Sequence, residues 1–239
     1  MSEAEAPGPD GLAARLLYRD AMMLVIDKPA GVPVHRGPGG GANLEEMFGA
    51  LRFGLPRDPA LAHRLDKDTS GCLVLGRHRK ALEKLGLLFK QGRVGKRYVA
   101  LVEGGPPEEE GLIELPLGRL DPTRGWRMKV DWAGQPARTR WRVLAREEGT
   151  TLLELSPLTG RTHQLRVHCA ALGFPIVGDP VYGTAGAHPL QLHARSVEIP
   201  LYKNREAVKV EAPLPSHMRA ALAGFGLASA SLEPARDGS

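Results

Sequence analysis

The sequence predicts an α+β fold, in which a few helices flank a mostly antiparallel mixed sheet. Short apolar runs bounded by turn residues are typical of strands, and they occur at 23–26, 72–75, 98–102, 152–155 and 190–193. The segment 111–155 contains several such runs without a helical period between them, which favours antiparallel hairpins over strand–helix–strand units. Apolar residues at helical spacing support only three helices.

The three predicted helices carry different signals. Asn43 with Glu46 three residues later resembles a capping box, which would open a short helix with an apolar face formed by Leu44, Met47, Phe48 and Leu51. The second helix has apolar residues at helical spacing between 82 and 89 and charged residues on its other face. The third is expected to run from Thr162, as its N-cap, to Leu172, with Gly173 as its stop.

The composition indicates one folded domain. The 239 residues are 42% hydrophobic and contain no internal repeat, so we expect a folded domain over 13–226, a disordered segment 1–12 and a flexible tail 227–239. Cys72 and Cys169 lie in apolar runs and are expected to be buried and unpaired, as in a reducing compartment. Without a long apolar stretch or a signal-peptide pattern, the sequence predicts a cytoplasmic protein.

Positive charge is concentrated in two segments. The net charge is only +5, but 77–97 and 119–146 each hold eight Lys and Arg residues, and the second also holds Trp126, Trp132 and Trp141. Cations interleaved with aromatic planes suit a polyanion with stackable bases. A solvated basic face with the tryptophans in the core explains the same composition equally well.

Two polar segments are candidates for chemistry. In 63–71 (HRLDKDTSG), Asp66 lies between Arg64 and Lys67, whose charges would keep it ionised as a nucleophile or base requires. The alternative is a charged turn that hydrogen-bonds its own backbone. In 159–168 (TGRTHQLRVH), the start of the third helix could hold an anion, but a plain amphipathic helix explains it as well.

Other chemistries lack support. The glycines of 37–41 are not followed by Gly-Lys-Ser/Thr, so a phosphate loop is not indicated. The spacing of histidines and cysteines matches no zinc site. Asp66 and Asp68 could form a glycosidase pair, but residues two apart in an extended loop usually point to different sides. The basic residues fall largely on predicted strands without helix-turn-helix spacing, which argues against a DNA-binding regulator.

These segments resemble the RluA family of RNA pseudouridine synthases. Six blocks follow the order of that family, at 17–31, 63–71, 96–100, 159–168, 178–183 and 192–194. The resemblance implies the family's catalytic fold and isomerisation of uridine to pseudouridine. It also implies that the reaction needs no cofactor, nucleotide or other, and no metal. Many relatives carry an RNA-binding domain before the first block, which here begins near Leu16, so the basic surface of the catalytic domain is expected to select the RNA.

The resemblance also implies roles for particular residues. Asp66 is the catalytic carboxylate, which either attacks the anomeric carbon or removes a ribose proton to give a glycal-like intermediate. Arg161 pairs with Asp66, Tyr98 lies against the target ring, and Leu165 packs beside it. Arg64 fills the space left by the flipped nucleotide. Direct contacts to RNA are expected from five further residues, His63, Lys67, Arg166, His168 and His193.

The implied partner is a structured RNA. The segments 134–137 and 209–213 look like the subgroup that modifies stem-loops of ribosomal and transfer RNA, and we expect a monomer that does not bind membranes. The main alternative is a non-catalytic RNA-binding or ribosome-assembly factor on the same fold, although Asp66, Tyr98 and Arg161 are all present. Residue order does not reveal the target uridine, because RNA recognition depends on shape.

Overall fold

The structure is a computed structural model that describes residues 9–37, 40–121, 125–184 and 188–225. Its strands are β1 (Leu16–Arg19), β2 (Met23–Lys28), β3 (Ala60–Leu61), β4 (Ser70–Gly76), β5 (Gly95–Glu103), β6 (Glu110–Glu114), β7 (Leu117–Arg119), β8 (Met128–Val130), β9 (Arg138–Glu147), β10 (Thr150–Pro157), β11 (Leu192–Ile199) and β12 (Val208–Glu211). Its helices are α1 (Pro9–Ala13), α2 (Arg79–Lys90), α3 (Gln164–Ala171) and α4 (Ser216–Leu222), with 3-10 helices η1 (Glu45–Leu51) and η2 (Ala223–Phe225).

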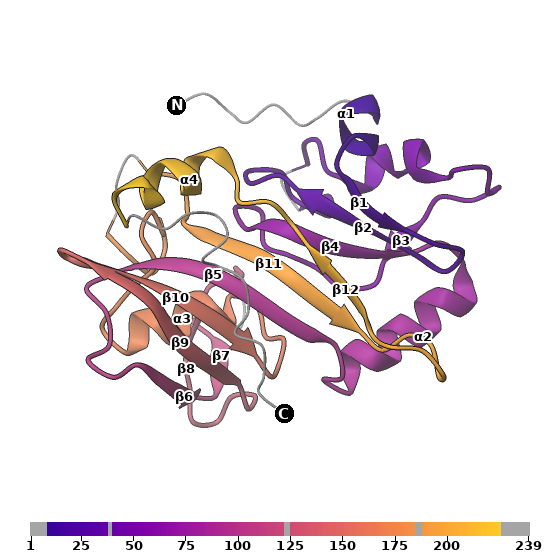
Figure 1. The fold of residues 1–239 in the computed structure, drawn as a ribbon. Coiled ribbons are helices and arrows are strands. Elements are labelled where there is room, and N and C mark those ends of the chain that lie inside the picture. The colour runs from indigo at the N-terminus through magenta and orange to yellow at the C-terminus, as the bar shows by residue number, and fades with distance from the viewer. Residues whose placement is uncertain (1–8, 38–39, 122–124, 185–187, 226–239) are drawn as a thin grey trace.

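One large mixed sheet crosses the molecule (Figure 1). Its main strand order is β1-β2-β4-β11-β5-β10-β9-β6, with β12 beside β11 and β3 beside β4. Neighbouring strands are antiparallel except for β4 and β11, which are parallel. A separate hairpin of β7 and β8 lies near α3 (Figure 1). The predicted α+β class and the antiparallel hairpins after residue 111 are confirmed.

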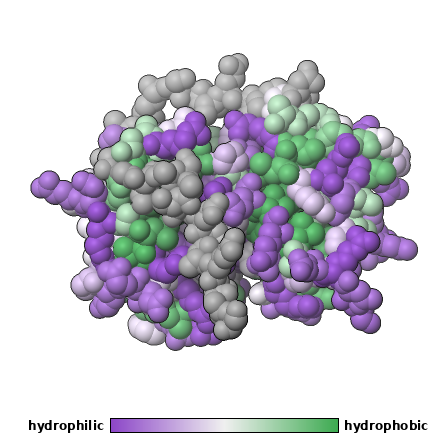
Figure 2. All heavy atoms as spheres, viewed as in Figure 1, coloured by the Kyte–Doolittle hydropathy of each residue, from purple (hydrophilic) through white to green (hydrophobic). Residues whose placement is uncertain are grey.

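Both faces of the central strands are covered. Side chains alternate between the faces of a strand, so Leu24 and Ile26 pack in one core while Met23 and Val25 pack in another. The first core lies under α1 and η1, and the second includes Leu85 of α2. Because both faces are buried, the central strands are continuous apolar runs rather than alternating ones. Figure 2 shows the outcome at the surface, where hydrophilic side chains line the outer edges and hydrophobic patches lie between them.

The first predicted helix is corrected by the structure. The segment forms the 3-10 helix η1, and its N-cap position is Leu44, without a side-chain capping hydrogen bond. Asn43 is buried instead of capping, and the amides of Leu44 and Glu45 donate to the carbonyls of Pro33 and Val34. These backbone bonds to a preceding segment replace the capping box. The predicted apolar face is present, since Leu44, Phe48 and Leu51 are buried.

The structure tests the predicted disorder of the N-terminal segment only in part. Residues 9–13 form α1 and Leu12 is fully buried, so the expected disorder of 1–12 is wrong from residue 9 onward. Residues 1–8 and the predicted tail 227–239 lie outside the described residues. Within the described part of the chain, no helix has the length and hydropathy needed to span a membrane. Both cysteines are buried and free, as predicted.

Helix α3 is shorter and more buried than the sequence suggests. It begins at Gln164, so Thr162 is not its cap, and its N-cap His163 has a left-handed φ of 53°. Residues 164 to 169 are all buried, because α3 packs against the sheet core on one side and the β7–β8 hairpin on the other. The solvated polar face considered for this helix is therefore absent. Its polar side chains are buried with partners, as the site requires.

Candidate active site

The catalytic-loop candidate, residues 63–71, lies between β3 and β4 and is fixed by a buried lysine. Lys28 has no exposed surface, and its ammonium donates to the carbonyl oxygens of Pro29 at 2.7 Å and Lys67 at 2.8 Å. Burial lowers the pKa of Lys28 to about 7, against the opposing charges of Asp68, Asp66 and Asp27. The bond to Lys67 fixes the backbone directly after Asp66, which limits where that carboxylate can point.

The other end of this loop is fixed by β11. Gly71 has a φ of 105°, and a Cβ there would lie 2.2 Å from the carbonyl oxygen of Ala194. Ser70 faces His193 across the parallel pair, with Ser70 Oγ 2.9 Å from His193 Nδ1. His193 Nε2 lies 3.4 Å from the carbonyl of Ala212, to which it donates, so Ser70 donates to Nδ1. The loop therefore joins a rigid strand at a position that only glycine fits.

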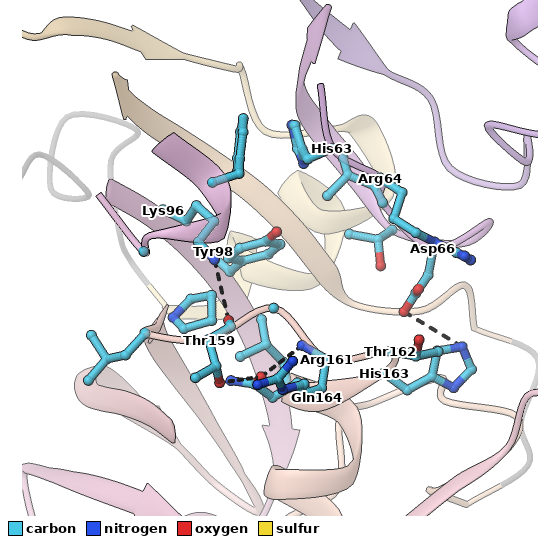
Figure 3. Close-up of a pocket in the computed structure, with 18 of the residues that line it drawn as sticks. His63, Arg64, Asp66, Lys96, Tyr98, Thr159, Arg161, Thr162, His163 and Gln164 are labelled. Carbon is cyan, nitrogen blue, oxygen red and sulfur yellow. Dashed lines mark hydrogen bonds and ion pairs between the residues drawn. The ribbon is translucent and has the colours of Figure 1, made fainter. Parts of the chain in front are cut away.

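Asp66 lies opposite two residues at the start of α3. Its Oδ2 lies 3.7 Å from His163 Nε2 and 4.0 Å from Arg166 Nη1, and its side chain remains 18% exposed (Figure 3). The predicted partner Arg161 is directed elsewhere, because its Nε donates to the carbonyl of Pro136 at 3.0 Å. Among the two arginines of this segment, Arg166 is the one that faces the carboxylate. The expected pairing of Asp66 with Arg161 is thus corrected.

Arg166 is itself fixed by a second carboxylate. Its Nε and Nη2 donate to the two oxygens of Asp179 at 2.8 and 2.6 Å, and both side chains are almost wholly buried. Burial opposes ionisation of Asp179, but the hydrogen bonds and charge of Arg166, with the amides of Val181 and Tyr182, outweigh it and lower the pKa of this carboxyl. A bidentate pair fixes both the position and the plane of the guanidinium. Arg166 therefore faces Asp66 in one orientation.

His163 connects Asp66 to the β7–β8 hairpin. Burial lowers its pKa, which favours the neutral ring. Arg166 Nη1 lies 3.4 Å from His163 Nε2, and a guanidinium can only donate, so the ring proton is assigned to Nδ1, which donates to the Tyr182 hydroxyl at 2.9 Å. That hydroxyl also accepts from the amide of Met128 at 2.8 Å. The ring of Trp126 packs edge-on against His163, with the centroids 4.8 Å apart.

A cavity of about 560 Å³ opens beside Asp66. Its lining brings together six predicted site residues besides Asp66, namely His63, Arg64, Tyr98, Arg161, Leu165 and Arg166. Burial, with the negative charge of Asp66 as the next cause, raises the pKa of Tyr98. Its phenol is therefore neutral at physiological pH. In Figure 3 the phenol ring lies between Lys96 and Asp66.

The end of the cavity away from Asp66 is formed by strand β5 and the loop before α3. Lys96 donates to the carbonyl of Thr159 at 3.3 Å, and the Gln164 side chain accepts from Thr159 Oγ1 and from the amide of Arg161. His63 stacks on Phe89 with a centroid distance of 4.5 Å, and its Nε2 accepts from the amide of Val74. Burial and the charge of Lys96 lower the pKa of His63 to about 3.

The residues expected to contact RNA fall into two groups. Lys67 is exposed and His63 lines the cavity as a neutral ring. His168 and His193 have no exposed surface, and Arg166 is 3% exposed. His168 accepts from Thr139 and donates to the carbonyl of Leu115, so it fixes the fold. Direct RNA contact by His168, His193 and Arg166 is corrected on this ground, since each spends its polar atoms on buried partners.

Sequence reasoning assigned no role to four residues that shape the site. Lys28, His163, Asp179 and Tyr182 all stood in the matched blocks, but nothing in their spacing indicates what they contact. The available signal for Lys28 was a weak one, a lysine that follows Asp27 at the end of the apolar run 23–26. The tryptophans divide as well, since Trp141 is buried while Trp126 and Trp132 are 54% and 79% exposed. The explanation that places the tryptophans in the core therefore holds for Trp141 alone, and stacking of RNA bases on the two exposed rings stays a prediction.

Comparisons with known proteins agree on the family. Residues 22–171 match the family model described as RNA pseudouridylate synthase. The chain is 47% identical over 209 residues to an uncharacterized RNA pseudouridine synthase of Zymomonas mobilis, covering 85% of this chain and 95% of that protein. It is 37% identical to the ribosomal large subunit pseudouridine synthase D of Nitrosomonas europaea, over 89% of this chain and 65% of that protein's length. It is 38% identical to the ribosomal large subunit pseudouridine synthase C of Haemophilus ducreyi, over 89% of this chain and 69% of that protein's length.

Solved structures agree with the fold. The human RNA pseudouridylate synthase domain containing 4 matches with a TM-score of 0.78 and 26% identity, covering 91% of this chain and 95% of that one. The human RNA pseudouridylate synthase domain containing 1 matches with a TM-score of 0.73 and 32% identity, covering 88% of this chain and 86% of that one. Fold and sequence together define an RNA-modifying isomerase that converts uridine to pseudouridine. The chain belongs to the RluA family of RNA pseudouridine synthases.

Proposed function

We propose that this enzyme isomerises uridines in structured ribosomal RNA, with Asp66 as its catalytic carboxylate. The observation that carries the proposal is the placement of Asp66 over the cavity, facing the buried cation of Arg166. The ribosomal substrate is supported by the C and D relatives, whose names specify the large ribosomal subunit. Transfer RNA remains the alternative substrate that the sequence suggested.

Arg166 orients Asp66 in this proposal. The guanidinium lies 4.0 Å from the carboxylate, and its buried pair with Asp179 prevents it from turning away. The ionised oxygen can attack the anomeric carbon or remove the proton from the neighbouring ribose carbon. Either path starts with the same carboxylate and separates uracil from ribose, so the geometry serves both.

The other cavity residues bind the ring and the space around it. Tyr98 packs against the target uracil, and its neutral phenol suits contact and hydrogen bonding better than removal of a proton. Leu165 supplies an apolar wall beside the ring. Arg64 is exposed at the cavity and takes the place of the nucleotide that turns out of the RNA.

RNA outside the cavity is held by charge and stacking. Lys67 is exposed next to the catalytic carboxylate and pairs with phosphate, and Arg161 is half-buried at the cavity wall. Trp126 offers an exposed ring next to His163, on which a base beside the target can stack. We further propose that the domain over 13–226 acts as a monomer in the cytoplasm, where ribosomal RNA is modified.

The test is pseudouridine formation by the Asp66→Asn variant on ribosomal RNA from cells that lack this gene. The amide keeps the size of the side chain but removes its charge, so we expect turnover to fall below detection while RNA affinity and melting temperature stay near the wild type. Mapping pseudouridines in cells with and without the gene would identify the uridine. Wild-type activity of Asp66→Asn would contradict the catalytic role of Asp66, whereas absence of pseudouridine formation by the wild type itself would favour the non-catalytic RNA-binding factor.

A further inference from the structure

Two lysines near the candidate site differ in their surroundings, since Lys28 is fully buried and Lys96 is half-buried. Lys28 is enclosed, with two carbonyl acceptors and the charges of Asp68, Asp66 and Asp27 nearby. Lys96 lines the cavity, and within the described ranges its ammonium has one hydrogen bond, to the carbonyl of Thr159. No carboxylate of the described residues lies within 4.0 Å of it, and burial lowers its pKa to about 8. Lys28 is thus a satisfied structural cation, whereas Lys96 keeps donors free toward the cavity.

The position of Lys96 relative to Tyr98 follows from strand geometry. The two residues are two apart on β5, so both side chains project from the same face of the strand. Both line the cavity, and in Figure 3 Tyr98 lies between Lys96 and Asp66. A uracil that packs on Tyr98 with its ribose toward Asp66 therefore extends its ring toward Lys96. The group farthest from N1 on that ring is the C4 carbonyl oxygen, and like the C2 carbonyl oxygen it accepts hydrogen bonds.

The reaction generates charge on those oxygens. When the bond between ribose C1′ and N1 breaks, the electron pair leaves with N1 and spreads over the two carbonyl oxygens of the uracil. The ring then turns, C5 bonds to C1′, and the proton lost from C5 is balanced by the proton that N1 gains. No oxidant, reductant or further reactant is required. A group that stabilises the separated, negatively charged ring lowers the barrier to the first step.

We propose that the Lys96 ammonium donates a hydrogen bond to a carbonyl oxygen of the target uracil and stabilises the negative charge of the ring after it separates from ribose. This role rests on the proposed function, since it requires Asp66 to act at the ribose end of the same cavity. It gives the two ends complementary tasks: the carboxylate reacts with the sugar and the ammonium holds the leaving base. The bond to Thr159 orients Lys96 for this task.

The test compares Lys96→Met with the wild type in single-turnover reactions at saturating enzyme. Loss of one preorganised donor to a developing oxyanion lowers such rates by about 10²-fold, and we expect this loss with RNA affinity changed by less than about threefold. Lys96→Arg keeps the charge and should recover most of the rate. Lys80→Met is the control for net charge, because Lys80 is exposed on α2 outside the cavity, and it should react at the wild-type rate.

A change of leaving group separates this role from a structural one. With 5-fluorouridine at the target position, fluorine withdraws electrons and stabilises the ring anion, so cleavage of the glycosidic bond should depend less on Lys96. We expect the decrease in cleavage rate caused by Lys96→Met to be about tenfold smaller on this substrate than on uridine. Lys96→Gln, which retains a donor for Thr159, should show the same dependence if Lys96→Met folds poorly.

Three outcomes would overturn the inference. They are an equal defect on both substrates, a defect confined to affinity as for a phosphate contact, and rescue of the rate in Lys96→Gln, which would point to the bond with Thr159 as the whole role. The proposed function fails separately, and visibly, if Asp66→Asn retains activity. One combination of results is also informative. If Asp66→Asn is inactive and the Lys96→Met defect is the same on uridine and 5-fluorouridine, the role of Lys96 is rejected and the role of Asp66 is kept.

Discussion

The candidate catalytic loop at 63–71 carries Asp66, and the hairpin arm, residues 117–121 and 125–132, contacts His163 and Tyr182. The two segments are built differently. The loop is fixed by Lys28 on one side and β11 on the other, and Thr69 and Ser70 are each 2% exposed. The hairpin arm is a separate two-stranded sheet that exposes Leu120, Trp126 and Trp132. It reaches the site through Trp126 on His163 and through Met128 on Tyr182.

This difference separates two requirements of an RNA-modifying enzyme. Bond cleavage needs a carboxylate held to within a fraction of an ångström, which buried hydrogen bonds supply. Binding a flexible RNA needs exposed planes and cations, which tolerate adjustment. Substitutions in the loop should therefore damage stability and turnover together, whereas substitutions in the arm should alter affinity.

Gly71→Ala should have the largest effect. The new Cβ would overlap the carbonyl of Ala194 in a backbone conformation that favours glycine, so the parallel pairing of β4 and β11 must open. We expect a loss of about 4 kcal/mol or more in the free energy of unfolding, measured by urea denaturation. Gly86→Ala is the matched control, since its Cβ would meet nothing within 4 Å in helix α2 and should be neutral or slightly stabilising.

Arg166→Met tests which arginine serves Asp66. It leaves Asp179 buried without its cation and Asp66 without its nearest one, so the free energy of unfolding should fall by about 3–5 kcal/mol and turnover should be lost. Arg161→Met should leave stability within about 1 kcal/mol and act mainly on RNA affinity. The opposite ranking in thermal melts and single-turnover rates would restore Arg161 as the partner of the carboxylate.

Lys28→Met should lower the free energy of unfolding by less than Arg166→Met does. Two buried carbonyls lose their donor, for a loss of about 1–3 kcal/mol, and kcat should fall because Asp66 is less well fixed. The pKa of Lys28 is about 7 in the folded protein and about 10.4 in an unfolded chain, so the unfolded chain binds its proton more tightly. Stability of the wild type relative to Lys28→Met should rise by about 2 kcal/mol between pH 7 and pH 9. Denaturation of both proteins at these two pH values measures the difference.

Trp126→Ala should have the smallest effect and be confined to binding. Loss of one stacked base is worth about 1 kcal/mol, so KM should rise about fivefold with kcat within a factor of two to three. Trp132→Ala is the matched control, a more exposed tryptophan of the same arm that makes no contact with His163 among the described ring pairs. Equal effects of the two substitutions on KM would contradict a specific stacking role for Trp126 and would show that both exposed tryptophans of the arm contribute alike to RNA binding.

The sequence predicted helix α2 and the strands at 23–26, 72–75, 98–102 and 152–155 well, because apolar periodicity depends on neighbours within a few residues. The run predicted as a strand at 190–193 overlaps only the first two residues of β11, which continues to Ile199. It placed Asp66 on a loop before a strand, as the structure confirms. The corrections share a physical cause. Thr162 and Asn43 carried capping signals, but bonds from Gln164 and from the segment at 33–34 satisfied those backbones instead. The choice between Arg161 and Arg166 depended on Asp179, a residue brought close only by the fold.

The parallel pairing of β4 and β11 has a consequence for synthesis of the protein. Ser70 and His193 are 123 residues apart in the chain, and their bond joins the catalytic loop to the strand beside it. Contacts over such separations form late, after the entropy of closing a long segment has been overcome. A nascent chain that has emerged only through α3 already carries Asp66, Arg166 and Tyr98, but not the neighbour that fixes the loop. The loop that carries Asp66 therefore reaches its final position only after β11 has been synthesised and has entered the sheet.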